Sequence, residues 1–417
     1  DRQMIVAPEV SVALQSCRTF RTMGEHVQLL TSTIPQLAGQ QADVAKVLEM
    51  VRDAGLLVSA ESESKRLFEA TGEDDSTLAP TRVFINTCDR PAAVTRLLES
   101  MLHAGNLSRH EHLFLVDDSR DPANAELNRQ AVEQFNLRSP RNMQYLGAAQ
   151  QGALLEALIT QSPEHEAGIR FLIDRQRWSG QQSYGLPRTL CLLFSVGRRA
   201  IVLDDDVICA AVESPHHKEG IAFGNFHQEL DFYASQEDIL SRTSRLDFDP
   251  LSGHASCLGM GIARAMDKLG FGGCKPELLK GANAAYLNQW QQDSPVLMTL
   301  TGSIGDPGSV DTGWIFSLDA ESSRRLLASA GGLEGGLTNR HYWMGQPRPT
   351  FSKLAVISQM TGLDNTHLLP PYFPVFRGED YLFGAMLEYL HPDAAILDYD
   401  WCVPHFPLDS RQGSLDV

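Results

Sequence analysis

The chain has 417 residues, enough for two or three domains of ordinary size. Hydrophobic residues make up 43% and charged residues 21%, a globular balance that excludes a mainly disordered or fibrous protein. The formal net charge of -17 would repel a polyanion, so we expect no nucleic-acid partner.

Residues 1–59 are expected to form a small, mainly α domain. Apolar residues recur at helical spacing over residues 10–20 and again over 44–51. Gly55 suits the position that follows a helix, and the apolar residues 56–58 predict a short strand. Helices followed by a terminal strand indicate a winged-helix-like domain.

The same pattern resembles the peptide-binding PqqD-like domains that are attached to peptide-modifying enzymes. The matching stretches are residues 8–17, Phe20-Arg21-Thr22 and residues 44–57. The resemblance implies recruitment of a peptide, while a packing or dimerisation role and DNA binding are the alternatives. Residues 60–80 are rich in Glu, Ser, Asp and Thr, which predicts a solvated linker.

From residue 81 to residue 417 the pattern changes to alternating strands and helices. The expected strands are residues 83–85, 113–116 and 200–203. The expected helices follow Pro91, cover residues 127–135 and cover residues 190–194. This alternation predicts an α/β, Rossmann-like domain with a parallel sheet.

Acidic residues follow each of the expected strands. They are Asp89, then Asp117 and Asp118, then the triplet Asp204, Asp205 and Asp206. The carboxyl ends of parallel strands meet at one edge of a sheet, where clustered carboxylates need a cation or hydrogen-bond donors. Oxygen ligands favour Mg²⁺ or Mn²⁺, which also bind substrate phosphates. A metal site is therefore predicted, with a solvated turn as the alternative.

Four motifs in order resemble those of family-2-type glycosyltransferases, which have the type-A (GT-A) fold. They are N-T-C-D-R-P at 86–91 with L-V-D-D-S at 115–119, the helix and D-x-D segment at 185–206, R-G-E-D-Y-L-F-G at 377–384, and V-P-H-F-P at 403–407. The resemblance spans residues 81–407 and implies a GT-A nucleotide-diphospho-sugar transferase.

The resemblance also implies roles for the matching residues. The residues expected at the nucleotide sugar are Thr87, Asp89, Arg90, Asp117, Asp118, Arg188, Asp204 and Asp205. Asp206 would bind the divalent metal, Mn²⁺ or Mg²⁺, with Asp204 and His405 assisting. A surface charge is the alternative for Arg188, and a packed ring is the alternative for His405.

An inverting transfer needs a carboxylate that removes the proton of the acceptor hydroxyl. The resemblance places Glu379 and Asp380 there, and because neighbours on a helix point about 100° apart, only one can face the reaction. We favour Asp380, although both acids could simply cap a helix. Trp314 is expected on the acceptor side, with burial in the core as the alternative.

Other regions depart from the family pattern. The segment of residues 206–311 is long for a simple family-2 domain, which indicates an insertion that shapes the acceptor site. Residues 296–300 and 345–371 are expected to form loops or a lid. The acceptor, whether a glycan, a peptide or a small molecule, is therefore not fixed by the resemblance.

Two other functions compete with a glycosyltransferase. A nucleotidyltransferase would use a similar sheet, but no glycine-rich phosphate loop with a basic partner follows the first strand. A winged-helix, ligand-sensing regulator would give Glu379, Asp380 and His405 no chemical reason to cluster. The seven cysteines are scattered and form no C-x-x-C pair. The sequence shows neither a leader nor a run of about 18 apolar residues. We therefore expect a cytoplasmic protein without a membrane span.

Overall fold

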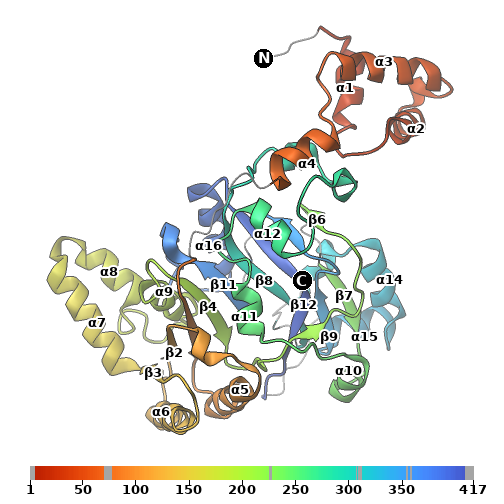
Figure 1. The fold of residues 1–417 in the computed structure, drawn as a ribbon. Coiled ribbons are helices and arrows are strands. Elements are labelled where there is room, and N and C mark those ends of the chain that lie inside the picture. Colours follow the sequence, from red (N-terminus) through yellow and green to blue (C-terminus); the bar gives the residue numbers. More distant parts are fainter. Residues whose placement is uncertain are drawn as a thin grey trace. The chain divides into compact units, whose positions relative to one another are not determined.

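The computed structural model describes residues 5–69, 78–224, 228–306, 308, 312–353, 356 and 359–408. The chain forms two compact units (Figure 1). The smaller unit takes Asp1–Asp74, Gly220–Gly224 and Gly261–Ser294, and the larger takes Asp75–Glu219, Asn225–Met260 and Pro295–Val417. The smaller unit thus includes two segments that the sequence pattern assigned to the α/β domain.

The smaller unit is mainly helical. Its elements are α1 (Pro8–Gln15), α2 (Met23–Thr33), α3 (Gln41–Asp53), α4 (Ala60–Phe68), β6 (Ala222–Phe223), α12 (Ile262–Lys268) and α13 (Ala284–Leu287), with short 3-10 turns at Pro35–Leu37 and Pro276–Leu279. Helices α1 to α3 share a core built on Ala13, Leu30, Val44 and Leu48. Helix α2, which the sequence pattern did not predict, begins with a capping box between Thr22 and Glu25.

The strand predicted at residues 56–58 is absent. Gly55 has a φ of 71°, and its amide donates to the carbonyl of Arg52 at 2.8 Å. The next amide, of Leu56, donates back to the carbonyl of Val51 at 3.1 Å. Helix α3 therefore stops just before Gly55, close to the predicted position, but the turn after it uses the Leu56 amide that a strand would need. The winged-helix assignment loses the strand on which it rested.

The first part of the predicted linker is a helix. Helix α4 begins at Ser59, whose hydroxyl accepts from the amide of Ser62, and its last residues Leu67 and Phe68 are buried. Phe68 stacks on Phe223 with 5.5 Å between ring centroids, and α4 also packs against α12. The prediction was wrong over residues 60–68 because these partners lie far downstream; residues 70–77 lie outside the described residues.

A mixed sheet forms the centre of the larger unit. Its strands follow the order β3 (Met143–Leu146), β2 (His112–Asp117), β1 (Thr81–Thr87), β4 (Arg199–Asp204), β11 (Met360–Asp364), β8 (Val296–Gly305), β12 (Ala395–His405) and β10 (Thr350–Ser352). Strands β1 to β4 are parallel, as predicted, while β11 is antiparallel to both of its neighbours. Strand β5 (Val212–Glu213) pairs with β12, and β9 (Tyr342–Gly345) joins β8 to β7 (Glu229–Phe232).

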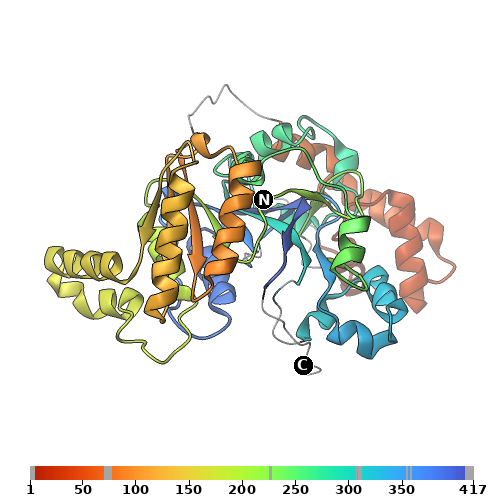
Figure 2. The same cartoon turned by 90° about the horizontal axis from the view of Figure 1, so that it is seen from below.

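Helices cover this sheet. They are α5 (Pro91–Ala104), α6 (Pro122–Asn136), α7 (Ala148–Gln161), α8 (Glu166–Ile173), α9 (Gly185–Leu193), α10 (Gln236–Arg242), α11 (Pro250–Ala255), α14 (Ala320–Ala328), α15 (Gly332–Thr338) and α16 (Glu379–Leu390). Helices α5 and α6 lie side by side (Figure 2). Leu186 and Leu190 of α9 share a core with Phe84 and Val202 of the sheet. Among the described residues, no helix is long and apolar enough to cross a membrane.

The lid predicted at residues 296–300 is instead the start of β8. Every residue of β8 is buried, and the strand lies between β11 and β12 in the sheet. A short apolar run without alternation is what a strand covered on both faces requires. The stretch 345–371 likewise contributes β10 and β11 to the same sheet, so the prediction of loops or a lid was wrong for residues 350–352 and 360–364.

Candidate functional site

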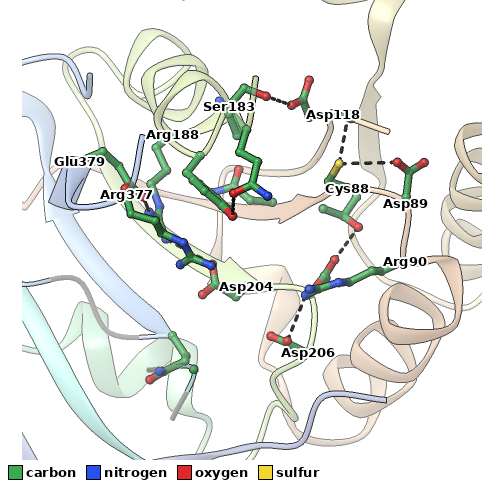
Figure 3. A pocket seen from close by; sticks show the side chains of 18 of the residues that line it. Cys88, Asp89, Arg90, Asp118, Ser183, Arg188, Asp204, Asp206, Arg377 and Glu379 are labelled. Carbon is green, nitrogen blue, oxygen red and sulfur yellow. Dashed lines mark hydrogen bonds and ion pairs between the residues drawn. The ribbon is translucent and has the colours of Figure 1, made fainter. Parts of the chain in front are cut away.

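A cavity of about 830 Å³ opens at the carboxyl ends of β1 and β4. The chain passes from β1 to β2 and β3 on one side and then to β4 on the other, so this is the point where the strand order reverses. Such switch points are where open α/β sheets bind ligands. Most of the residues proposed from the sequence line it, namely Thr87, Asp89, Arg90, Asp118, Arg188, Asp204, Asp205, Asp206, Glu379, Asp380 and His405 (Figure 3).

Asp89 fixes the rim of the cavity beside β1. Its φ of 58° lies in the left-handed region, which Asp tolerates better than most residues. Its carboxylate accepts from the amides of Arg120 and Asp121 at 3.1 and 3.0 Å, and these hydrogen bonds lower its pKa against the opposing effect of burial. Asp89 therefore ties the loop after β1 to the loop after β2.

The two acids after β2 have different surroundings. Asp117 does not line the cavity; it accepts from the Tyr145 hydroxyl at 2.8 Å and from the Asn128 amide at 3.0 Å, so its contacts stabilise the fold. Asp118 faces the cavity and binds Arg175 Nε at 2.6 Å and the Ser183 hydroxyl at 2.5 Å. Asp118 thus anchors the segment between α8 and α9 against the end of β2.

The acidic triplet after β4 is largely neutralised by neighbouring side chains. Arg90 Nη1 lies 3.3 Å from Asp205 and 3.1 Å from Asp206, and the Thr87 hydroxyl donates to Asp205 at 2.7 Å. Burial, followed by the charge of Asp206, raises the pKa of Asp205 to about 7. Asp204 is the most open of the three, with 36% of its side chain exposed.

His405 connects this triplet to β8 and β12. Its Nε2 lies 2.7 Å from Asp206 Oδ1, and its Nδ1 donates to the carbonyl oxygen of Asp306. A carbonyl that accepts from one ring nitrogen is how metal-binding histidines are usually held, but here the other nitrogen contacts the Asp206 carboxylate. Among the described residues, no group of three or more His, Cys, Asp or Glu side chains already converges as a metal site. Asp204, Asp206 and His405 line the same cavity, and carboxylate oxygens and imidazole nitrogens are atoms that divalent ions take as ligands.

Arg188 holds the opposite wall of the cavity together. Its guanidinium pairs with Glu379 at 2.5 Å and lies 3.6 Å from Asp204. Burial raises the pKa of Glu379, and Arg188 opposes that rise. The surface-charge alternative is excluded, since the Arg188 side chain is only 16% exposed. Asp380 also lines the cavity, and its side chain accepts from the amide of Tyr381 at 2.9 Å.

Trp314 does not reach this cavity. It lies in the 3-10 turn Gly313–Ser317 and packs against Phe232 and Tyr342, with ring centroids 6.2 and 5.5 Å away. Its position therefore agrees with the packing alternative rather than with an acceptor-side role at the cavity.

Several lining residues were missed from the sequence. They include Cys88, Arg120, Tyr184, Arg340 and Arg377. Burial, followed by the charge of Asp118, raises the pKa of Cys88 to about 11, so its thiol stays protonated near neutral pH. Arg377 directly precedes the glycine of the R-G-E-D motif, a signal that could have identified it. Arg340 had no local signal, because Asp306 positions it from a distant part of the chain.

No protein-family model matches the chain, and no curated protein sequence is significantly similar to it.

Proposed function

We propose that the protein is a metal-dependent glycosyltransferase that moves a sugar from a nucleotide-diphosphate donor to an acceptor hydroxyl. The observation that carries the proposal is the position of Asp204 and Asp206, at the strand-order switch and in one cavity with Glu379 and Asp380. The order of these motifs along the chain, and the α/β fold, agree with a GT-A enzyme.

The proposed donor site lies at the ends of β1 and β4. Asp206, Asp204 and His405 would hold Mn²⁺ or Mg²⁺, which would supply positive charge to the donor diphosphate. Thr87, Asp89 and Asp118 line the cavity at the ends of the neighbouring strands β1 and β2, where they would face the nucleoside. Arg90, which already pairs with Asp205 and Asp206, would be close to the diphosphate.

The ion pair between Arg188 and Glu379 distinguishes the two candidate bases. Glu379 is only 5% exposed and its carboxylate is held by Arg188, so an acceptor hydroxyl would reach it poorly. Asp380 is the more accessible acid and also lines the cavity. In the proposed inverting reaction, the acceptor oxygen attacks the anomeric carbon, its proton passes to Asp380, and the nucleoside diphosphate leaves.

Thermal stabilisation by nucleotides is the most direct test. UDP, GDP, CDP, ADP and dTDP would each be added with and without Mn²⁺, because a ligand at 100 times its Kd stabilises the native state by about 2.7 kcal/mol. At least one of them is expected to raise the Tm only when Mn²⁺ is present. Nucleotide sugars with the same base would then be screened for release of the nucleoside diphosphate. Release of pyrophosphate from a nucleoside triphosphate would indicate a nucleotidyltransferase instead.

The smaller unit is proposed to recruit the acceptor. Its sequence pattern resembles that of peptide-binding PqqD-like domains, so the acceptor would be a peptide. Among the residues that the structure describes, those that line the cavity all belong to the larger unit. Removal of residues 1–58, which carry α1 to α3, should therefore weaken acceptor use more than donor binding. Equal loss of both in a folded truncated variant would argue against recruitment.

A further inference from the structure

Arginine side chains line the cavity from several different segments. They are Arg90, Arg120, Arg188, Arg340 and Arg377. Most are already held by protein oxygens: Arg90 and Arg188 by the acids described above, Arg340 by Asp306, and Arg120 by the carbonyl oxygen of Gln181. Within the described parts of the chain, the Arg377 guanidinium makes no hydrogen bond or ion pair; it lies over the Tyr184 ring, and its charge acts on Glu379 from beyond ion-pair distance.

That contact leaves the hydrogen-bonding edge of Arg377 open. The guanidinium carbon lies 4.2 Å from the centroid of the Tyr184 ring, so the group contacts the face of an uncharged ring that takes none of its N–H groups as a conventional donor. Figure 3 shows the Arg377 side chain reaching into the cavity on the side of Asp204. The N–H groups of a guanidinium lie in its plane, and a stacked face does not occupy them.

The backbone around Arg377 is held in an unusual conformation. Phe376 has a φ of 72° and Gly378 a φ of 88°, which puts both neighbours of Arg377 in the left-handed region. Phenylalanine rarely adopts that region, and such conformations persist mainly where the surroundings or a function require them. Arg377 therefore lies in a constrained segment that directly precedes α16.

We propose that Arg377, stacked on Tyr184, binds the phosphate oxygens of a substrate. If Arg377 served only to offset the negative charge of the cavity, it would contact a carboxylate, as Arg188 contacts Glu379. Arg377 instead lies on a neutral ring with a free donor edge, and a planar guanidinium can bind two oxygens of one phosphate. The inference rests on the proposed function in one respect, because the donor diphosphate is the first source of such a group and a phosphorylated acceptor is the second.

Inorganic pyrophosphate is the probe, and calorimetric titration gives its Kd. The substitution Arg377→Gln should weaken binding about tenfold or more, because it removes charge-assisted hydrogen bonds. Arg377→Lys keeps the charge but not the planar group, and it should fall between Gln and the parent. Arg324→Gln is the matched control, since Arg324 is 67% exposed, pairs with Glu321 on α14 and does not line the cavity.

The role of Tyr184 has its own pair of variants. Tyr184→Phe keeps the ring and should bind pyrophosphate as the parent does, whereas Tyr184→Leu removes the stacking surface and should weaken binding. The proposal is overturned if the parent does not bind millimolar pyrophosphate, or if Arg377→Gln binds it as tightly as Arg324→Gln does.

Competition separates the two sources of phosphate. If a nucleoside diphosphate with Mn²⁺ displaces pyrophosphate, Arg377 binds the donor; if both bind together, Arg377 belongs to the acceptor. Arg377-dependent binding of pyrophosphate without any nucleotide effect would keep this subsite and remove the proposed donor. Nucleotide binding that is unchanged in Arg377→Gln, without Arg377-dependent binding of pyrophosphate, would keep the proposed donor and remove this subsite.

Discussion

Arg188 and Glu379 form an ion pair between α9 and α16, with 2.5 Å between Nη1 and Oε1. Arg188→Met would leave the buried Glu379 carboxylate without its partner, a change that typically costs about 3–5 kcal/mol of unfolding free energy. Adding Glu379→Gln to that variant should recover part of the loss, because the uncompensated charge is gone. Urea unfolding of the parent, both single variants and the double variant would measure the coupling. Strictly additive losses would contradict the pairing.

Glu379 and Asp380 are expected to have different roles in the reaction. Asp380→Asn is expected to lower kcat by about 10²–10⁴, the usual contribution of a positioned base, while leaving the Kd of the donor unchanged. Glu379→Gln should lower kcat less and should act mainly on stability. Steady-state transfer at saturating donor gives the comparison. Full turnover by Asp380→Asn would reopen the possibility of a retaining mechanism.

Asp206 should control the response to metal. Asp206→Asn keeps the shape of the side chain but removes its charge, so the Mn²⁺-dependent rise in Tm with a nucleoside diphosphate should largely disappear. Glu126→Gln, on the exposed surface of α6, removes the same charge elsewhere and should leave that rise intact. If the two variants respond alike to Mn²⁺, the metal does not bind at Asp206.

Acid should destabilise the protein through His254. This ring is fully buried on α11, its Nδ1 lies 3.0 Å from the Thr299 hydroxyl, and burial lowers its pKa from 6.5 to about 3. The unfolded chain therefore binds a proton that the folded chain does not, and stability is lost as the pH falls below 6.5. Between pH 7 and pH 5 this histidine should cost about 2 kcal/mol.

His254→Gln should reduce that loss, as measured by urea unfolding at several pH values. His165→Gln is the control, because His165 is 73% exposed and should leave the pH dependence unchanged. Parallel pH profiles for the parent and His254→Gln would contradict the buried, neutral ring.

The boundary of the smaller unit can be tested by truncation. Removing residues 1–58 deletes the α1 to α3 core but leaves α4, with its Ser59 cap, packed against α12. Removing residues 1–80 also deletes α4 and exposes its buried partners Phe223 and Leu279. The shorter deletion should keep cooperative unfolding and nucleotide binding, while the longer one should lower the Tm and aggregate. If the two deletion variants have the same Tm and the same solubility, residues 60–80 act as the linker that the composition predicted.

Local sequence patterns predicted the acidic residues of the site, whereas contacts between residues far apart in the sequence determine the position of its other residues. The strands ending at Thr87 and Asp204, and the convergence of their acids, follow from short apolar runs and from the geometry of parallel sheets. Residues 296–300, the start of β8, were interpreted as a loop or lid because a strand buried on both faces lacks alternation. Likewise, the Tyr184 ring meets Arg377 only after almost 200 residues of intervening chain have folded.

The composite smaller unit constrains the order in which the protein can fold as it is synthesised. Helix α4 emerges early, but α12, against which it packs, follows about 200 residues later, or roughly 10–40 s at ordinary rates of translation. Leu67 and Phe68 have no native partner in α12 during that interval. The ribosome-bound chain therefore carries an exposed apolar helix end well before either unit is complete, and this segment is where a chaperone should bind the nascent protein.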